Sequence, residues 1–184
     1  MKKMIVMMGG QGVGKGTFSA MLRLERDYNY VEVGAILRSL SPGTEIGRIV
    51  ARGELVPDNA LFNLLRPSFI TDKDIILDGF PRSLSQAKWL LEQFSGRFDI
   101  RVIYLDVPEN VMLSRINKRI RDGGNRADDA DAIVIRRRLD NFWKCTMPAI
   151  EWLRNERGIK FFDVRVDGSD VNENFAKVRS AVYS

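Results

Sequence analysis

The sequence contains no histidine and only one cysteine among its 184 residues. Cys145 therefore has no intrachain disulfide partner, and no group of cysteine and histidine side chains exists to hold zinc. Long apolar runs are also missing, because no stretch approaches the roughly 20 apolar residues of a membrane span. The apolar run Met4–Met8 is shorter than the core of a secretion signal, which needs about 7–15 residues. We therefore expect a cytoplasmic protein, with Cys145 as a small packing residue.

The composition is otherwise that of an ordinary soluble domain. Hydrophobic residues make up 45% of the chain and charged residues 29%, and the length fits one domain with a substantial core. The sequence has no internal repeat or low-complexity segment. A formal net charge of +5 favours a polyanionic ligand. Nucleic acid and nucleotide phosphates both fit that charge, so it does not choose between them.

Short apolar segments alternate with helical patterns along the chain. Ala87, Leu90, Leu91 and Phe94 have the spacing of one buried helix face, and Asp170 is placed to cap a helix near the end. Such alternation predicts an α/β fold with a parallel sheet covered on both faces, and a ligand site at the carboxyl ends of the strands. The five predicted strands are Met4–Met8, Tyr30–Val33, Asp74–Leu77, Val102–Asp106 and Lys160–Val166.

A glycine-rich segment lies between the first predicted strand and the first predicted helix. Glycines allow the backbone to curl so that several N–H groups face one anion, and a helix N-terminus adds its positive end. Lys15 adds a full charge, and Thr17 offers a hydroxyl to metal-bound phosphates. Strand, glycine-rich turn, lysine and helix together predict a phosphate-binding loop rather than a simple turn with a solvated lysine. The segment reads Gly9-Gly10-Gln11-Gly12-Val13-Gly14-Lys15-Gly16-Thr17.

The end of this loop has an unusual order, because Gly16 separates Lys15 from the hydroxyl of Thr17. This Gly-Lys-Gly-Thr ending resembles the nucleoside monophosphate kinases, above all the adenylate kinase family. That family usually carries proline where this chain has Gln11.

Four further stretches resemble the same family in the same order, so the resemblance spans nearly the whole chain. They are Gly53–Asp58, Asp78–Arg82 followed by Gln86, Asp106–Pro108 followed by Arg115 and Arg119, and Arg126–Asp129 followed by Arg136–Leu139.

The resemblance implies a three-layer P-loop kinase fold in one domain, 1–184. The core is expected at 1–33, 66–118 and 139–184. A helical monophosphate-binding lobe is expected at about 34–65, where two or three short helices are predicted, and a lid at about 119–138. The polar lid segment is short, which implies that the metal-bearing insertion of some relatives is missing and that no structural zinc is present.

The resemblance also implies a role for each matching residue. Arginine suits phosphate sites because its planar fork meets phosphate oxygens bidentately and stays charged. Arg115 and Arg119, four residues apart, share one helix face. The implied catalytic residues are Lys15, Arg82, Arg119, Arg126 and Arg138. The implied ATP-binding residues are Gly10, Gln11, Gly12, Val13, Gly14, Lys15, Gly16, Thr17 and Arg115. The implied monophosphate-binding residues are Val33, Gly34, Arg38, Glu54, Leu55, Val56, Gly79, Arg82, Gln86, Arg126 and Arg138.

Three of these assignments have structural alternatives. Asp78 is expected, with Thr17, to orient the water ligands of an ATP-bound Mg²⁺, although it could simply cap a turn at a strand end. Gln86 has the capping-box spacing from Ser83, so its amide could satisfy a helix start instead of a base.

The segment before Leu139 is one residue longer than the family spacing. Arg138 is therefore chosen over Arg136 for the inner position, with a solvated basic face as the alternative.

The expected reaction is Mg²⁺-dependent transfer of the γ-phosphate of ATP to AMP. The lack of histidine is compatible with this reaction. A nucleotide phosphate is already an anionic nucleophile, and catalysis of phosphoryl transfer is mostly positioning and charge neutralisation. Val33-Gly34-Ala35 lacks the hydroxyl and carboxylate that the family usually carries there, so CMP, UMP or a broad set of acceptors is the alternative.

A nucleotide-dependent RNA-binding protein and an inactive scaffold are the competing classes. Basic residues interleaved with aromatic ones, which RNA binding favours, are not found, and Lys15, Asp78 and Arg82 oppose an inactive scaffold. We expect a monomer that binds ATP and AMP and has no nucleic-acid or membrane partner.

Overall fold

The computed structural model describes residues 1–123, 131–168 and 170–184. In this part of the chain, five parallel strands form one sheet in the order β2-β3-β1-β4-β5. The predicted five-stranded parallel sheet is therefore confirmed. The strands are β1 Lys2–Met8, β2 Asn29–Glu32, β3 Ile75–Asp78, β4 Phe98–Asp106 and β5 Lys160–Arg165.

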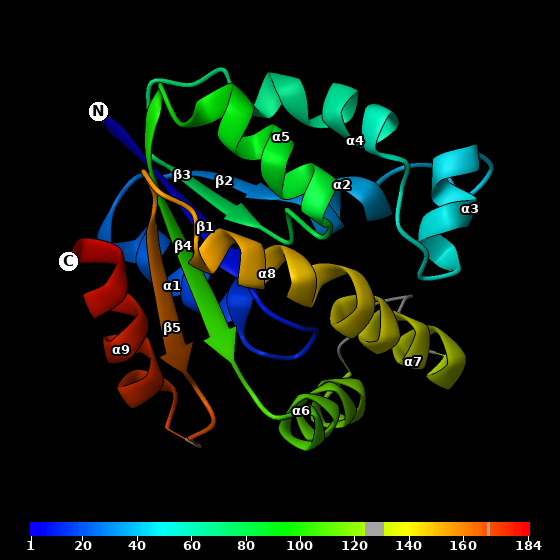
Figure 1. The fold of residues 1–184 in the computed structure, drawn as a ribbon. Helices are drawn as coiled ribbons and strands as arrows, with labels where there is room; N and C mark the ends of the chain where they lie inside the picture. The colour runs from blue at the N-terminus through cyan, green and yellow to red at the C-terminus, as the bar shows by residue number, and fades with distance from the viewer. Residues whose placement is uncertain (124–130, 169) are drawn as a thin grey trace.

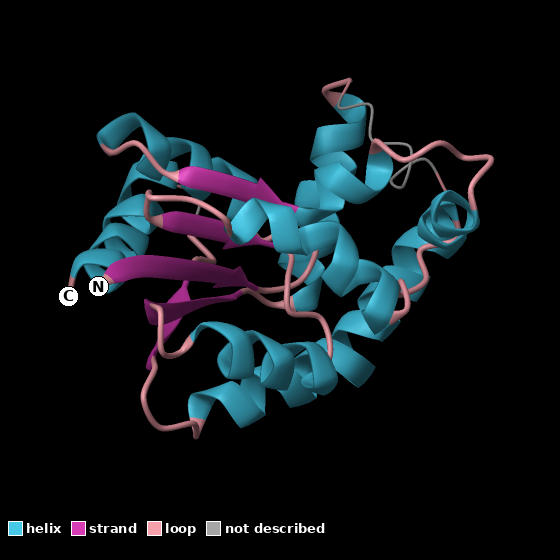
Figure 2. Cartoon of the chain, turned by 90° about the horizontal axis from the view of Figure 1, so that it is seen from above, coloured by secondary structure: helices cyan, strands magenta, loops and turns pink. Residues whose placement is uncertain are grey.

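Helices cover both faces of this sheet (Figures 1 and 2). On one face α1 packs against α9, and on the other α5 packs against α8. None of the described helices is long and apolar enough to cross a membrane. The helices are α1 Lys15–Glu25, α2 Val33–Arg38, α3 Glu45–Ala51, α4 Asp58–Leu65, α5 Leu84–Phe94, α6 Glu109–Arg121, α7 Ala132–Asn141, α8 Met147–Arg154 and α9 Val171–Tyr183, with a 3₁₀ turn at Arg66–Phe69 and a π-helical segment at Phe142–Thr146.

The central strands read as continuous apolar runs because both faces of the sheet are covered. Met4–Met7 of β1 and Ile75–Leu77 of β3 are completely buried. The predicted helix face is also confirmed, since Ala87, Leu90 and Phe94 of α5 are buried. The Asp170 carboxylate caps α9 as expected, because it accepts from two backbone N–H groups of the first turn.

Several predicted strand limits are wrong by a few residues. The predicted strand Tyr30–Val33 ends at Glu32, and Val33 begins α2. The reason is that Glu32 pairs with Asp78, the last residue of β3, after which Gly79 turns the chain at φ +82°. Strand β3 is likewise shifted by one residue. On the other side of β1, strand β4 begins earlier than predicted because its ladder with β1 continues back to Phe98.

The segment between β2 and β3, for which two or three short helices were predicted, contains the three α-helices α2, α3 and α4. The last of them, α4, is joined to α5 by a stack of Phe62 on Trp89, whose rings lie 4.2 Å apart and are nearly parallel. A polar contact continues this junction, because Gln86 Nε2 of α5 donates to Asp58 Oδ1 of α4 at 2.9 Å. Aromatic stacking and a hydrogen bond therefore attach α4 to the body of the protein.

Substitution of Leu90 by alanine tests the core on this face. Leu90 is completely buried, so Leu90→Ala is expected to lower the free energy of unfolding by about 2–5 kcal/mol. Leu24 is 90% exposed, so Leu24→Ala serves as the matched control, with an expected change within about 0.5 kcal/mol. Urea denaturation followed by circular dichroism measures both. Equal losses for the two variants would contradict the described packing.

Candidate active site

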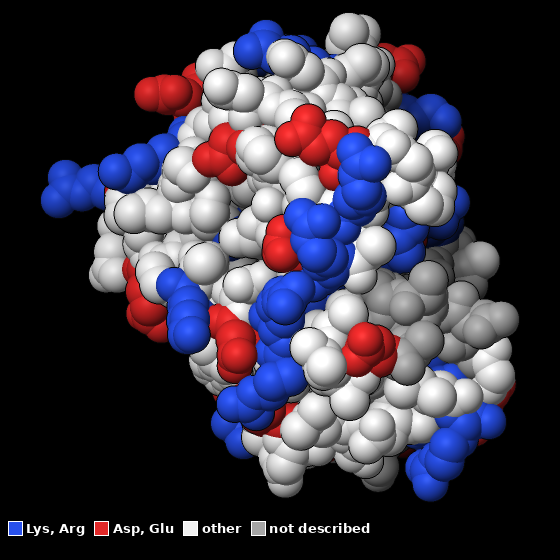
Figure 3. All heavy atoms as spheres, turned by 90° about the vertical axis from the view of Figure 1, so that its right-hand side faces the viewer, with Lys and Arg blue, Asp and Glu red and all other residues white. Residues whose placement is uncertain are grey.

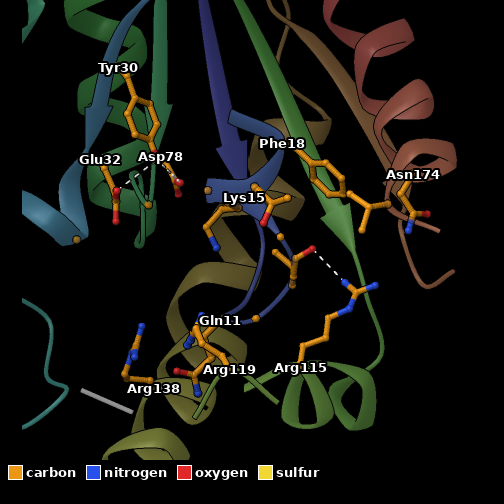
Figure 4. Close-up of a pocket in the computed structure, with 18 of the residues that line it drawn as sticks. Gln11, Lys15, Phe18, Tyr30, Glu32, Asp78, Arg115, Arg119, Arg138 and Asn174 are labelled. Carbon is orange, nitrogen blue, oxygen red and sulfur yellow. Dashed lines mark hydrogen bonds between the residues drawn. The ribbon is translucent and has the colours of Figure 1, made fainter. Parts of the chain in front are cut away.

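A cleft of about 790 Å³ lies at the carboxyl ends of β1, β2 and β3. Its walls come from the loop after β1, the ends of β2 and β3, and helices α2, α6, α7 and α9 (Figure 4). Among the described residues, eight basic side chains line it against two acidic ones. Such an excess of positive charge favours an anionic ligand. The basic residues are Lys15, Arg23, Arg38, Arg82, Arg115, Lys118, Arg119 and Arg138, and the acidic ones are Glu32 and Asp78.

The glycine-rich loop connects β1 to α1 as predicted and forms the floor of the cleft, where residues 11–17 line the cavity. Gly12 and Gly14 have φ of +79° and +106°, a region that side chains rarely adopt. A Cβ on Gly12 would lie 2.7 Å from the main-chain oxygen of Met112. The loop can therefore pass α6 this closely only with glycine at position 12.

Lys15 is the first residue of α1, and its ammonium group reaches back across the loop. Its Nζ donates to the carbonyl oxygens of Gly9 and Gly10, each at 2.8 Å. Two main-chain acceptors fix the direction of the side chain at the helix N-terminus. The positive charge thus lies at the end of the helix where an anion is favoured.

Asp78 ends β3 and is only 6% exposed at the side of the cleft. Burial raises the pKa of its carboxyl group, while the nearby Lys15 charge and a hydrogen bond lower it. That hydrogen bond comes from the Tyr30 hydroxyl, which lies 3.1 Å from Asp78 Oδ2. Burial also raises the pKa of Tyr30, so the phenol keeps its proton and remains a donor.

Arg38 and Arg82 approach the same part of the cleft from different elements. Arg38 is the last residue of α2, and its Nη2 donates to Glu32 Oε1 at 2.9 Å. Arg82 follows β3, and its Nε donates to Gly79 O at 2.7 Å. Both guanidinium groups line the cavity next to Lys15 and Asp78.

Arg115 and Arg119 lie on one face of α6 and both line the cleft, as their spacing predicted. Arg115 is held by main-chain oxygens, because Nη1 donates to Val13 O at 3.1 Å and Nη2 to Val166 O at 2.7 Å. Burial lowers the pKa of Arg115, but its guanidinium stays charged at neutral pH. This arginine joins the phosphate-binding loop to the segment before α9.

Arg136 and Arg138, the two candidates for the inner position, both lie on α7 but point to different sides of it. Arg138 lines the cleft, whereas the Arg136 side chain is 67% exposed and contacts Glu109 and Asp140. The structure therefore brings Arg138, and not Arg136, to the main cleft. The same helix contacts the loop, because Gln11 Nε2 donates to Ile135 O at 2.8 Å.

Some of the predicted site residues do not line the main cleft. Gly10 and Leu55 line a smaller adjoining pocket of about 80 Å³ that shares Lys15, Arg82 and Arg138 with the main cleft. Val33, Glu54, Val56 and Gln86 line neither cavity, and Arg126 lies outside the described residues.

These outlying residues have contacts elsewhere. Val33 is 1% exposed and packs in the hydrophobic core. Glu54 pairs with Arg52 at 2.9 Å. Gln86 is 2% exposed, and its Oε1 accepts from the backbone N–H of Arg82 at 2.8 Å. The Ser83 hydroxyl caps α5 by accepting from the Gln86 backbone N–H, as the capping-box alternative requires, but the Gln86 amide bonds to Arg82, one residue before the cap, and not to the Ser83 N–H.

Sequence reasoning missed several residues that line the cleft, in particular Tyr30 and Glu32. They are two residues apart on β2 and so lie on one face of the strand. Their alternation with Val31 and Val33, which are buried, is the signal that could have found them. Arg23, Lys118 and Asn174 also line the cleft and lie outside the motifs.

The phosphate-binding loop, the acidic residue at the end of β3 and the convergent arginines define a nucleotide-binding phosphotransferase. Residues 7–158 match the family described as adenylate kinase, and this chain belongs to that family. The match covers the loop, both carboxylates of the cleft and all the arginines that line it.

Curated relatives along nearly the whole chain bear the same name. An adenylate kinase of Prochlorococcus marinus (strain MIT 9301) is 33% identical over 189 aligned positions, covering 96% of this chain and all of the relative. One from Thermus thermophilus is 34% identical and covers 97% of this chain and 96% of the relative. One from Bacteroides thetaiotaomicron is 36% identical, covering 83% and 85% respectively.

Replacement of Gly12 by alanine tests the loop geometry. The added Cβ meets a main-chain oxygen at a positive φ, and strain of about 1–3 kcal/mol is typical of such positions. Gly12→Ala is therefore expected to weaken ATP binding roughly tenfold or more, as measured by isothermal titration calorimetry. Gly96→Ala is the control, because a Cβ there meets nothing within 4 Å. Unchanged ATP affinity in Gly12→Ala would contradict a tight approach of the loop to α6.

Proposed function

We propose that this protein catalyses reversible, Mg²⁺-dependent transfer of the γ-phosphate of ATP to AMP, giving two ADP. One observation carries the proposal: arginines from α2, the β3–α5 turn, α6 and α7 line a single cleft together with Lys15 of the phosphate-binding loop. A site for one nucleotide needs fewer converging cations, whereas two phosphate chains meeting end to end need charge on both sides.

The residues of the cleft fit a hydrated Mg²⁺. Oxygen donors suit this ion, and Asp78 and the Thr17 hydroxyl both line the cavity. Among the described residues no group of three or more carboxylate, cysteine or histidine side chains could hold a metal directly, so Asp78 and Thr17 would act through water and through the ATP phosphates. When bound, the ion neutralises phosphate charge.

The side chains of the protein then position the two phosphates. Backbone N–H groups of the loop, the end of α1 and Lys15 would hold the ATP phosphates, with Arg115 beside the base. Arg38 and Arg82 would hold the acceptor phosphate, while Arg119, Arg138 and, from outside the described residues, Arg126 would neutralise charge on the transferring group. No general base is required, because the acceptor phosphate is already an anion.

AMP is the proposed acceptor, with CMP, UMP or a broad set as the alternative. The family name of the relatives supports AMP. Val33 is buried in the core and Gln86 contacts Arg82 and Asp58, so neither side chain lines the cleft in which a base would bind. We further propose a monomeric, cytoplasmic enzyme in which a lobe at about 34–65 and a lid at about 119–138 close over the nucleotides.

RNA binding remains the alternative from another class of function, and the surface charge gives it little support. Basic side chains form a diagonal stripe on the side of the molecule where α3 and α7 lie (Figure 3). However, acidic side chains also lie beside this stripe. On α7, Arg136 contacts Glu109 and Asp140, and Arg137 contacts Glu54, so part of the basic charge is neutralised. We therefore favour the cleft rather than this surface as the ligand site.

The proposed function is tested by assays of ADP formation from ATP with AMP, CMP, UMP, GMP or dTMP as acceptor. AMP is expected to have the highest kcat/KM, and chelation of Mg²⁺ is expected to abolish turnover. Salt-sensitive binding to RNA without ADP formation from any acceptor would reject the proposal.

Arg138→Ala and Arg136→Ala form a matched pair that tests the assignment on α7. Arg138 lines the cleft, so its loss is expected to reduce kcat by roughly 10²–10³-fold, the scale for one preorganised donor. Arg136 is on the same helix but largely exposed, so its loss is expected to change kcat less than about threefold. Steady-state kinetics with saturating ATP and AMP measures both. A reversed order of effects would place Arg136 at the inner position.

The pH dependence of kcat/KM tests the ionised form of Asp78. Burial raises the pKa of this carboxyl group, so protonation is expected to reduce activity as the pH falls, and activity is expected to rise with pH through that pKa. Asp78→Asn should be weakly active and lack this acidic limb, when rates are compared between about pH 5 and pH 8. A persistent acidic limb in the variant would show that another group titrates.

The same shift predicts the stability of this variant. Because the folded state holds the Asp78 proton more tightly than the unfolded chain, the stability due to this group falls as pH rises through its raised pKa. Asp78→Asn is therefore expected to melt no lower than the wild type at pH 7. Calorimetry at that pH measures this and separates lost activity from unfolding.

A further inference from the structure

Glu32 places a carboxylate at the boundary between the sheet and the helical segment that follows β2. It is the last residue of β2, pairs in register with Asp78 of β3 and directly precedes α2. Its side chain is 28% exposed and lines the cleft. Figure 4 shows Glu32, Tyr30 and Asp78 together on one side of the cavity.

Arg38 and Tyr30 both donate toward the Glu32 carboxylate. Arg38 Nη2 donates to Oε1 at 2.9 Å, and the Tyr30 hydroxyl lies 3.4 Å from Oε2. The same hydroxyl lies 3.1 Å from Asp78 Oδ2. A tyrosine hydroxyl has one proton to donate, so its shorter contact favours Asp78. Arg38 is therefore the stronger of these two partners of Glu32 in this state of the protein.

The ion pair with Glu32 holds one nitrogen of the Arg38 guanidinium. Arg38 ends the six-residue helix α2, whereas Glu32 immediately precedes the same helix. The side chain folds back along the helix, and a Cβ on Gly34 would lie 2.8 Å from Arg38 Nη1. Glu32 thus binds Arg38, the arginine that is expected to bind the acceptor phosphate.

We propose that Glu32 competes with the phosphate of the acceptor nucleotide for Arg38 and so sets the affinity of the acceptor site. The proposal rests on the function proposed above. A phosphate brings about two negative charges, and it would approach the same nitrogen that the carboxylate occupies. On acceptor binding the phosphate replaces the carboxylate at Arg38, and the Tyr30 hydroxyl, 3.4 Å from Glu32 Oε2, would turn its single proton from Asp78 to the displaced carboxylate.

Glu32→Gln tests this competition because it keeps the size of the side chain and removes its charge. KM for the acceptor, and its Kd from calorimetry, are expected to fall roughly three- to tenfold, which corresponds to about 0.7–1.4 kcal/mol. We expect kcat and KM for ATP to change less than about twofold. The Glu32–Arg38 pair is already broken once the acceptor is bound, so its loss does not alter the step from the complex to the transition state. Glu92→Gln, an exposed change of equal charge on α5, is the control and should leave all constants unchanged.

Tyr30→Phe provides a second, independent variant. It removes the donor for the displaced carboxylate, so KM for the acceptor is expected to rise in the wild-type background. In the Glu32→Gln background the same change is expected to leave that KM unaltered. This dependence on the partner is a result that a merely structural role of Tyr30 would not produce.

The outcomes separate the failure of this inference from the failure of the proposed function. If the wild type forms ADP with none of the five acceptors, the proposed function fails. If it is active but Glu32→Gln leaves KM and Kd for its best acceptor unchanged, the competition is refuted. A rise in both constants would also refute it, since Glu32 would then hold Arg38 ready for the phosphate. Melting temperatures of all variants confirm that the comparison is between folded proteins.

Discussion

Main-chain carbonyl groups orient three of the cationic side chains of the cleft, and this constraint underlies the rest of the site. Lys15 donates to Gly9 and Gly10, Arg82 to Gly79, and Arg115 to Val13 and Val166. A carbonyl oxygen orients a cation without cancelling its charge, unlike a carboxylate. Because these oxygens come from the loops at the ends of parallel strands, the sheet itself determines where the charge collects.

The walls of the cleft are also joined to one another across long stretches of sequence. Gln11 of the loop contacts Ile135 of α7, and Asn141 of the same helix donates to Gly53 O at 3.0 Å. Helix α7 therefore touches both the phosphate-binding loop and the end of the segment that follows α3. Motion of α7 cannot be independent of either neighbour, because each contact is a hydrogen bond that must break or move with it.

Local sequence patterns were sufficient for much of this arrangement. Alternating segments predicted the parallel sheet, glycine spacing predicted the loop, and four-residue spacing predicted that Arg115 and Arg119 would share a helix face. The pairing of Glu32 with Asp78 could not be predicted, because it depends on the register of two strands more than 40 residues apart. The inward contacts of Gln86 similarly depend on Asp58 arriving from α4. Residues fixed by local periodicity were predictable, whereas those fixed by long-range register were not.

The stack of Phe62 on Trp89 has a mechanical consequence for how this molecule can open. Two aromatic planes in van der Waals contact resist sliding apart, and the hydrogen bond from Gln86 to Asp58 reinforces them. Helix α4 is thus anchored on α5, although it is contiguous in sequence with α2 and α3. If the lobe proposed at about 34–65 closes over the nucleotides, these contacts favour a hinge between α3 and α4, with α4 staying on the body of the protein.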